Sequence, residues 1–465
     1  MKHLFSRLFL VVLLAAIYAG CSAPGAATNG GDAYSSTIQP IFDAKCSSCH
    51  GAGKTEAGLN LTSWDHLIKG SDNGEAIIAF DGDHSVIVRM ATQLVGGAHP
   101  ANQPASALTE AEVATLKSWI DQGAKGPEGL APFSGNREFV YVTNQGEATI
   151  NVIDVEANVV ARRVDLTKMG FDKGAKPHHV AVEPDGSFWY ATLISGNVIL
   201  KFNRNNEIVG RSEFEVPGLL SMDPSSSKLY VGRSMAAVNP PQRIGMIDRE
   251  TMEIEELDVF FPRPHALAVS ADGEYVYSAS LAENKAIAVE VKNEESTFVD
   301  IDGPIHTVVD LEVSPDGKIM VGTAQLTGKV FFFDATNPAE FPLIEAIDVN
   351  AAPWHPVFSR DGAKVYFANK MDLTVTVVDV ASRKVEAVIE GYGLAQPHGA
   401  ALSLDGKTLY ISGNNLNAAY ESRHDFGEGS RNPGTVAVID LTTNKVVKVL
   451  EVGLYASGTG GRPSF

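Results

Sequence analysis

The chain has 465 residues and carries 56 acidic against 37 basic side chains, a formal net charge of −19. This length is enough for two or three domains, and the acidity excludes a nucleic-acid partner, because neutralising phosphates requires a basic surface. Apolar residues make up 44% and charged residues 20% of the chain, a balance typical of a compact, β-rich globular protein.

The N-terminus has the pattern of an export signal. Two basic residues precede an apolar run, residues 8–19, that is too short to cross a membrane comfortably. The run ends in Tyr-Ala-Gly-Cys21, which resembles a bacterial lipobox, although Tyr18 stands where leucine is usual. We expect residues 1–20 to be removed and Cys21 to carry lipid, which places the protein on a membrane in the periplasm or at the cell surface. An ordinary secretory signal cleaved nearby is the alternative. Residues 21–33 then form a flexible tether.

The segment Cys46-Ser-Ser-Cys49-His50 is the attachment signature of haem c. Two thioether bonds anchor the porphyrin, and His50 directly follows as the proximal iron ligand. Apart from Cys21 there is no further cysteine, so no disulfide framework is expected. A redox Cys-x-x-Cys or a zinc site is the alternative, but no second ligand pair follows at zinc-finger spacing.

The residues around this signature predict helices. A helix is expected over residues 38–45, and Thr109 and Glu112 form a capping box at the start of another. This second helix continues with apolar residues at helical spacing and ends at a glycine (Val113, Leu116, Ile120 and Gly123). The pattern resembles small c-type cytochrome domains that are fused to other bacterial redox proteins, which implies an all-α cytochrome c domain over residues 34–126.

The sixth ligand of the haem iron has two candidates. Domains of this kind commonly place Met-Pro just before the last helix, and here that place holds His99-Pro100. We therefore predict His99, which gives bis-histidine ligation and a low potential relative to His/Met. Met90 is the alternative ligand, unless it only packs in the core. His66 and His84 are expected at the surface.

From about residue 138 the sequence changes to short strands that recur with turn signals. Tight turns, mostly Asp-Gly, recur every 38–49 residues, which is about the length of one four-stranded propeller blade. Each turn precedes a strand that usually carries tyrosine (Tyr141, Tyr190, Tyr230, Tyr277, Val321, Tyr366 and Tyr410), and a following strand often ends in Asp (Asp154, Asp248, Asp334, Asp379 and Asp440).

Seven strands of the tyrosine type predict seven blades over residues 138–465, and the whole chain is therefore expected to be mainly β. The first tyrosine strand lacks an upstream inner strand, so we expect residues 454–465, or the segment near Phe133, to complete the first blade. The pattern resembles YVTN-type and lactonase-type seven-bladed propellers.

Histidines recur at the start of the inner strands, which all line the central channel of a propeller. His178, His265 and His398 each stand seven residues before the turn aspartate, and His179 and His355 stand six before it. His306 stands ten before its turn, and His424 comes from a long insertion in the last blade, residues 414–433. Such spacing predicts a metal site at one end of the channel. The alternative is that the imidazoles only hydrogen-bond their neighbours, but clustering them costs desolvation.

The count of seven histidines with a leading His-His pair resembles nitrous oxide reductases, whose propeller holds a multinuclear copper-sulfide cluster. The resemblance rests on this pattern alone, without a shared stretch of sequence. It implies copper ligation by His178, His179, His265, His306, His355, His398 and His424, and nitrous oxide as substrate. Lys370, on the strand after His355, is a candidate for electrostatic or proton support, and a solvated surface lysine is its alternative.

The resemblance also implies how electrons arrive. Nitrous oxide reductases have a dicopper domain that needs two cysteines, and this chain has none to spare, so haem c would replace it. A periplasmic or membrane donor would reduce the haem, and a head-to-tail homodimer would bring haem and cluster together. The rival interpretations are a haem-binding propeller similar to cd-type nitrite reductases, which usually have eight blades, and a non-enzymatic, lipid-anchored electron carrier that docks other proteins. A lactonase is disfavoured, because ester hydrolysis has no use for haem.

Overall fold

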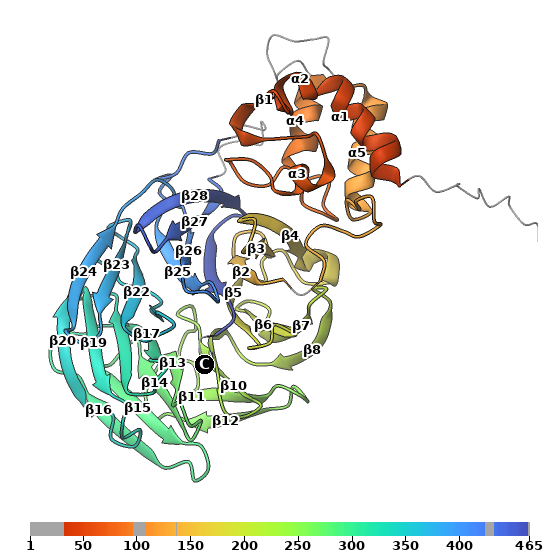
Figure 1. The fold of residues 1–465 in the computed structure, drawn as a ribbon. Helices are drawn as coiled ribbons and strands as arrows, with labels where there is room; N and C mark the ends of the chain where they lie inside the picture. The colour runs from red at the N-terminus through yellow and green to blue at the C-terminus, as the bar shows by residue number, and fades with distance from the viewer. Residues whose placement is uncertain (1–31, 96–107, 136, 424–431, 464–465) are drawn as a thin grey trace, which may run out of the picture.

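A computed structural model of the chain describes residues 32–95, 108–135, 137–423 and 432–463. It consists of a small helical unit and a ring of sheets (Figure 1). The helical unit contains η1 (Tyr34–Ile38), α1 (Gln39–Lys45), α2 (Ser47–His50), β1 (Lys54–Thr55), η2 (Glu56–Gly58), α3 (Trp64–Ile68), α4 (Val86–Val95) and α5 (Glu110–Asp121). No helix among the described residues has the length and apolar character needed to cross a bilayer.

The helices of this unit form where the sequence predicts them. The Thr109 hydroxyl accepts a hydrogen bond from the backbone N–H of Glu112, whose carboxylate accepts one from Thr109, so the capping box is present. The apolar side of α5 then packs against the first helices in one core (Tyr34, Ile38, Phe42, Leu116, Trp119 and Ile120). This core fixes the orientation of the short turn that carries the two cysteines.

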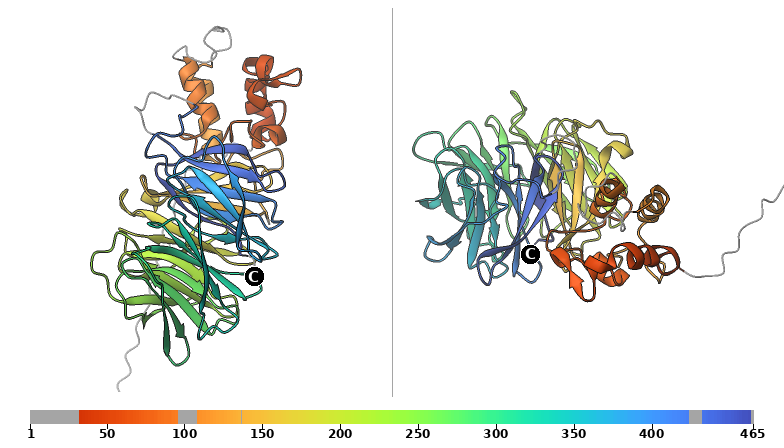
Figure 2. Two further views of the ribbon diagram at one scale, coloured as in Figure 1. Left: turned by 90° about the vertical axis from the view of Figure 1, so that its left-hand side faces the viewer. Right: turned by 90° about the horizontal axis from the view of Figure 1, so that it is seen from above.

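The described residues from 137 onward form seven four-stranded sheets in a ring, which confirms the seven-bladed propeller (Figure 1); Figure 2 shows the same ring from two further sides. From the inner to the outer strand, the first four blades are β29 (Ala456–Gly460), β2 (Phe139–Asn144), β3 (Thr149–Asp154), β4 (Val159–Asp165); β5 (Pro177–Val182), β6 (Phe188–Leu193), β7 (Val198–Asn203), β8 (Ile208–Glu213); β9 (Pro217–Met222), β10 (Lys228–Arg233), β11 (Arg243–Asp248), β12 (Ile254–Asp258); and β13 (Pro264–Val269), β14 (Tyr275–Ser280), β15 (Lys285–Glu290), β16 (Ser296–Asp300).

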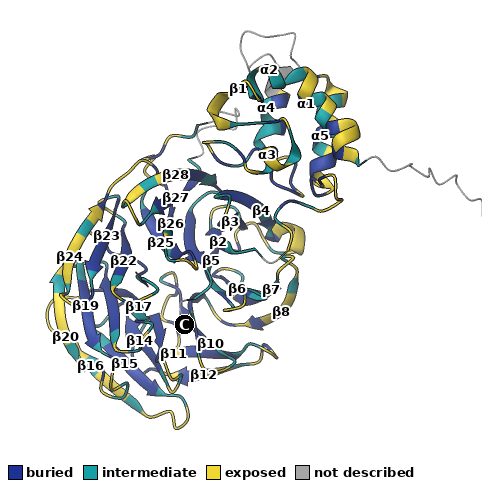
Figure 3. Cartoon of the chain, in the orientation of Figure 1, coloured by how far each residue is buried: buried dark blue, intermediate teal, exposed yellow. Residues whose placement is uncertain are grey.

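The remaining three blades are β17 (Val308–Val313), β18 (Ile319–Ala324), β19 (Lys329–Asp334), β20 (Leu343–Asp348); β21 (Val357–Phe358), β22 (Lys364–Asn369), β23 (Thr374–Asp379), β24 (Lys384–Ile389); and β25 (Pro397–Leu402), β26 (Thr408–Gly413), β27 (Gly434–Asp440), β28 (Lys445–Val452). A short helix, η4 (Leu166–Met169), follows the first blade. The second and third strands are mostly buried, whereas outer strands such as β20 and β24 expose much of their length (Figure 3).

The sequence markers fall on equivalent strands. The tyrosine-type segments are the second strand of every blade, and the Asp-ended segments are third strands. The turn glycines adopt the left-handed conformation that an Asp-Gly turn requires, as at Gly186 with φ +68° and Gly273 with φ +74°. The tight turn and the second strand therefore mark each blade reliably.

The C-terminal strand closes the ring, which confirms the first of the two predicted alternatives, residues 454–465 and not the segment near Phe133. β29 pairs with β2 as the inner strand of the first blade, with Tyr141 opposite Gly460 and Val142 opposite Thr459. Gly458 lies against the next inner strand, and a Cβ there would be 1.9 Å from the backbone oxygen of His178. Only glycine allows β29 and β5 to approach this closely.

We expect Gly458→Ala to destabilise the propeller by about 2 kcal/mol or more, because the added methyl group must push the closing strand away from β5. Thermal unfolding of the variant and of the unmodified protein measures the difference. Gly53→Ala is the matched control, since a Cβ at Gly53 meets nothing within 4 Å. Equal unfolding temperatures for all three proteins would contradict this view of ring closure.

The helical unit packs directly on the seam between the first and last blades, near β4 and β28 (Figure 1). Ile78 is buried in one apolar cluster with Val140, Val160 and Leu450 of the propeller. Polar contacts flank it: Arg163 lies 3.3 Å from Asp81, and the Arg423 guanidinium donates to the Asn73 carbonyl at 3.0 Å. The two units are therefore held in a defined contact on the outer wall of the ring.

Glu75 makes this contact sensitive to pH. Its Oε2 accepts a hydrogen bond from the Val160 backbone N–H at 3.2 Å, and burial raises the pKa of Glu75 from 4.5 to about 7. The unfolded chain loses this proton near pH 4.5 and the folded chain near pH 7, so stability falls as the pH rises between these values and stays lower above them. We expect Glu75→Gln to gain roughly 1–3 kcal/mol at pH 8 and little at pH 5, measured by thermal unfolding at both pH values. An equal effect at the two pH values would contradict the assignment.

Candidate functional site

The haem-attachment residues lie on one helical turn. Cys46 and Cys49 are free thiols, and the backbone N–H of His50 donates to the Cys46 carbonyl at 2.9 Å. Cys46 packs against the core of the helical unit, and burial raises the pKa of its thiol to about 11. Two unpaired thiols followed by an imidazole on the same turn are the donor set that haem c needs, so these residues fit the group.

The distal side of the haem site is only partly described. Met90 lies on α4, half-buried. His99 lies outside the described residues, so the choice between His99 and Met90 stays a prediction. His66 and His84 are exposed, and His84 pairs with Asp81 at 2.8 Å.

Five of the predicted propeller histidines gather around the channel in two layers. The first layer contains His178, His265 and His398, each at the second position of its inner strand (β5, β13 and β25). In the sixth blade Trp354 takes the equivalent place ahead of β21, directly after Pro353, which bridges to Asn369 of β22. The second layer, one residue further along, contains His179, Asp310 and His355. The two offsets from the turn, seven and six residues, therefore correspond to two heights in the channel.

The imidazoles of these layers approach one another closely. Ring centres are 5.0 Å apart for His355 and His398, 5.6 Å for His179 and His355, 6.1 Å for His178 and His398, and 6.3 Å for His178 and His265. The Trp354 ring lies 4.1 Å from that of His398. The first and second layers thus form one continuous cluster of side chains around the axis.

Four imidazole nitrogens of this cluster are buried without a hydrogen-bond partner among the described residues: Nε2 of His178, His265 and His355, and Nδ1 of His398. In two of these rings, a hydrogen bond from the other ring nitrogen fixes the orientation. His265 Nδ1 donates to the Val309 carbonyl at 2.7 Å, and His355 Nδ1 donates to the Asp310 carboxylate at 2.7 Å. In both neutral rings Nε2 therefore carries a free lone pair, the state that a metal ligand requires.

Burial keeps the cluster neutral. It lowers the pKa of His265 and His355 to about 3, and it lowers the pKa of His178, His179 and His398 as well, with neighbouring charges as a further cause. Lys370 lies beside the first layer, with Nζ 4.9 Å from the centre of the Trp354 ring, and burial lowers the pKa of Lys370 to about 8. All five imidazoles are available as neutral donors at pH 7.

Of the remaining two predicted ligands, the structure describes only His306. His306 precedes β17 and does not join the cluster, so the structure does not place it with the other predicted ligands. Both of its ring nitrogens are hydrogen-bonded elsewhere, Nδ1 with the Thr327 hydroxyl at 2.8 Å and Nε2 with the Asp302 carbonyl at 3.0 Å. The position that faces the channel in this blade belongs to Asp310, which stands six residues before the turn residue Asp316. His179 and His355 have the same offset. The offset itself, whatever the residue type, therefore predicts that Asp310 faces the channel. His424 lies outside the described residues.

The cluster does not surround a single ion. Within the described ranges, no three His, Cys, Asp or Glu side chains are placed to hold one metal ion. A mononuclear site is therefore not formed, and any metal group held here would have to span several imidazoles.

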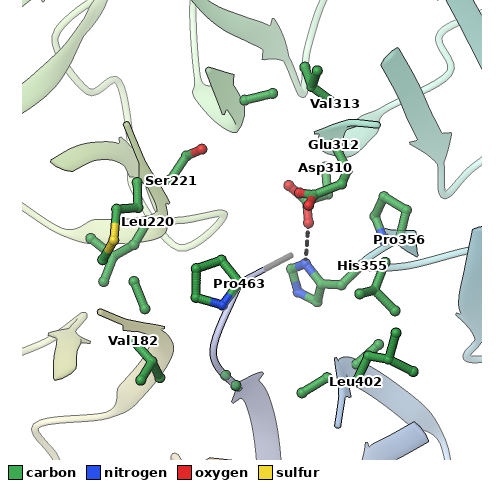
Figure 4. A pocket seen from close by; sticks show the side chains of 18 of the residues that line it. Val182, Leu220, Ser221, Asp310, Glu312, Val313, His355, Pro356, Leu402 and Pro463 are labelled. Atoms are coloured by element: carbon green, nitrogen blue, oxygen red, sulfur yellow. Dashed lines mark hydrogen bonds and ion pairs between the residues drawn. The ribbon is translucent and has the colours of Figure 1, made fainter. Parts of the chain in front are cut away.

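A cavity of about 260 Å³ opens on the far side of the second layer. His179, Asp310 and His355 form one end, and aliphatic residues of the inner strands form its walls (Figure 4). Pro463 of the C-terminal segment lies in the same pocket, and Glu312 is next to Asp310. The volume is below the range typical of drug-sized ligands, so the cavity suits a very small molecule.

Comparison with known proteins identifies the helical unit. Residues 46–96 match the family model described as planctomycete cytochrome C, and a domain of this kind implies haem c. The curated proteins contain no match. Among solved structures, hydrazine synthase of Kuenenia stuttgartiensis is 19% identical over 61% of this chain and 88% of that chain, with a TM-score of 0.49.

A protein of unknown function from Desulfotomaculum acetoxidans is 16% identical over 69% of this chain and 99% of that chain, with a TM-score of 0.54. At this identity the likeness concerns the fold alone. The chain therefore combines a domain similar to planctomycete cytochromes c with a seven-bladed β-propeller.

Proposed function

We propose that the protein is an extracytoplasmic oxidoreductase in which haem c passes electrons to a multinuclear copper-sulfide cluster in the propeller channel, and that its substrate is nitrous oxide. One observation carries the proposal: four buried nitrogens of neutral imidazoles in the channel cluster have no partner in the part of the chain that the structure describes. Leaving them so costs free energy unless a ligand satisfies them. A redox role for the whole chain agrees with the cytochrome c domain.

His178, His265, His355 and His398 would hold the copper, with His179 beside them. When bound, copper bridged by sulfide would supply electron density to an inert linear molecule. Asp310 and the Val309 carbonyl hold His355 and His265 in the ligating orientation. Lys370 supplies a nearby cation and an N–H donor at the first layer. The reaction, N₂O with two electrons and two protons giving N₂ and water, needs such a proton donor.

The ligand set departs from the resemblance that suggested it. Of the six predicted histidines that the structure describes, five gather. His306 is engaged elsewhere, and in its blade the carboxylate of Asp310 faces the channel instead. The proposal therefore requires a cluster with fewer imidazole ligands than in nitrous oxide reductases. The seven sheets and the small cavity count against a second haem in the manner of cd-type nitrite reductases.

The direct test of this function monitors the oxidation state of haem c. The copper-loaded protein is reduced until haem c is ferrous, and nitrous oxide is added without oxygen. We expect the haem to reoxidise and N₂ to form in proportion to the electrons released. Reoxidation that is as slow as in copper-free protein would overturn the proposal.

A second candidate, an electron carrier whose propeller only docks other proteins, is favoured by the lack of a chelating arrangement in the described part of the chain. It requires no propeller metal. In both cases we propose lipid attachment at Cys21, which lies outside the described residues, and reduction by a periplasmic or membrane donor. A head-to-tail homodimer is part of the copper proposal, because the haem unit sits on the outer wall of its own propeller (Figure 2).

A further inference from the structure

His179 is the imidazole of the channel cluster whose tautomer is fixed by a backbone N–H group. Its Nδ1 accepts a hydrogen bond from the backbone N–H of Leu220 at 3.2 Å. Leu220 lies on β9, so this N–H comes from the third blade, whose inner strand carries no histidine. A backbone N–H can only donate, so Nδ1 of His179 carries the lone pair and the proton of the neutral ring is on Nε2.

This tautomer is the opposite of the one at His265 and His355, where Nδ1 donates and Nε2 keeps its lone pair. A metal binds an imidazole through a lone pair, and the lone pair of His179 is already occupied by Leu220. To bind copper through Nε2, His179 would have to move its proton to Nδ1, which would then face the Leu220 N–H as a second donor. The backbone hydrogen bond therefore disfavours His179 as a ligand.

The His179 side chain is also the most open of the cluster. It lines the cavity of about 260 Å³ and is half-buried, whereas the other four imidazoles are at most 5% exposed (His178, His265, His355 and His398). Among the described residues, no group accepts a hydrogen bond from its Nε2, and the ring centre of His355 lies 5.6 Å away. A hydrogen-bond donor thus lies beside a proposed copper ligand, at the end of a space that suits a very small molecule.

We propose that His179 is not a copper ligand but a catalytic residue, which donates its Nε2–H to the oxygen atom of the substrate held in the cavity. The identity of this substrate rests on the proposed function. In nitrous oxide the N–O bond breaks, N₂ is released, and the oxygen takes up two electrons delivered by way of haem c and two protons to leave as water. Negative charge therefore develops on the oxygen, and a donor fixed beside it stabilises this charge more than it stabilises the bound substrate. His179 itself stays neutral and keeps its proton, since the protons come from other groups.

The tautomer is tested without copper. In full-length haem protein that contains isotope-labelled histidine and is reduced to the ferrous state, a long-range proton–nitrogen correlation spectrum distinguishes a protonated ring nitrogen from one with a lone pair. We expect the proton of His179 on Nε2, and the signals are assigned by their loss in His179→Gln. A proton on Nδ1 would overturn the proposal, whether or not the protein reduces nitrous oxide.

The contact with the substrate is tested on the same copper-free protein. Dissolved nitrous oxide is the probe, and xenon is the comparison, because xenon also enters small cavities but has no acceptor atom to offer. We expect nitrous oxide to shift the Nε2 signal of His179 more than xenon does. Equal shifts with the two gases, or no shift with either, would overturn the proposal.

Variants of the copper-loaded protein separate a donor from a ligand. His179→Leu removes the donor, and His179→Gln is the matched control, because its side chain keeps an N–H group. We expect both variants to retain the copper content of the unmodified protein, while His179→Leu lowers kcat about 100- to 1000-fold and His179→Gln recovers much of this loss. Loss of copper from His179→Leu, or an unchanged kcat, would overturn the proposal.

Two outcomes are assigned in advance. If His179→Leu does not fold, the tautomer and the comparison of the two gases on the unmodified protein decide. A chain that has the expected tautomer and the expected response to nitrous oxide, but does not reduce this gas, would refute only the function proposed above.

Discussion

His355→Ala is expected to weaken copper binding by more than tenfold, because it removes both a donor nitrogen and the ring that Asp310 orients. Asp310→Asn is expected to weaken it about 10- to 100-fold while leaving every imidazole in place, since loss of an outer partner typically has this effect. Copper per chain, measured after equilibration at a buffered copper concentration, gives both values.

His306→Ala is the matched control for these variants. His306 is a buried propeller histidine, but both of its ring nitrogens are bonded outside the cluster. We expect its copper content to equal that of the unmodified protein. If His306→Ala lost copper as strongly as His355→Ala, the assignment of ligands to the two layers would be wrong.

Replacement of Cys46 and Cys49 by alanine is expected to abolish covalent haem. Both thioether bonds are then lost, and haem is no longer retained under denaturing conditions. Haem staining of a denaturing gel and the absorbance of the purified protein measure the loss. Ser48→Ala changes the exposed residue between the two cysteines and should leave haem unaffected. Covalent haem in the double cysteine variant would contradict the attachment site.

Much of this fold is predictable because its signals are local. Tight turns, tyrosine-bearing second strands and the capping box at Thr109 each depend on residues a few positions apart, and each lies where the sequence predicts it. The sequence also predicts that a further segment completes the first blade, since that blade lacks an inner strand upstream, but it does not decide between β29 and the segment near Phe133. Such features follow from backbone conformation and strand alternation.

The composition of the channel is predictable only in part. The fixed offset from the turn correctly groups His178, His265 and His398, and separately His179 and His355, but the irregular offset of His306 marks a residue outside both layers. Trp354 and Asp310 enter the layers because register, and not residue type, decides which side chain faces the axis.

Sequence patterns do not predict the contact between the helical unit and the propeller. Ile78 and Glu75 belong to the helical unit, yet they pack against strands more than sixty residues away in the chain. Nothing in the local pattern around them distinguishes a residue buried in its own unit from one buried at the boundary between units.

In the proposed function, the channel imidazoles hold copper beside a haem-containing domain. The most direct measurement is the content of copper and iron per chain in protein matured in a copper-replete host. One iron with several copper ions is the predicted result. One iron without copper would contradict the claim and leave the docking electron carrier, and two iron without copper would place a second haem on the propeller.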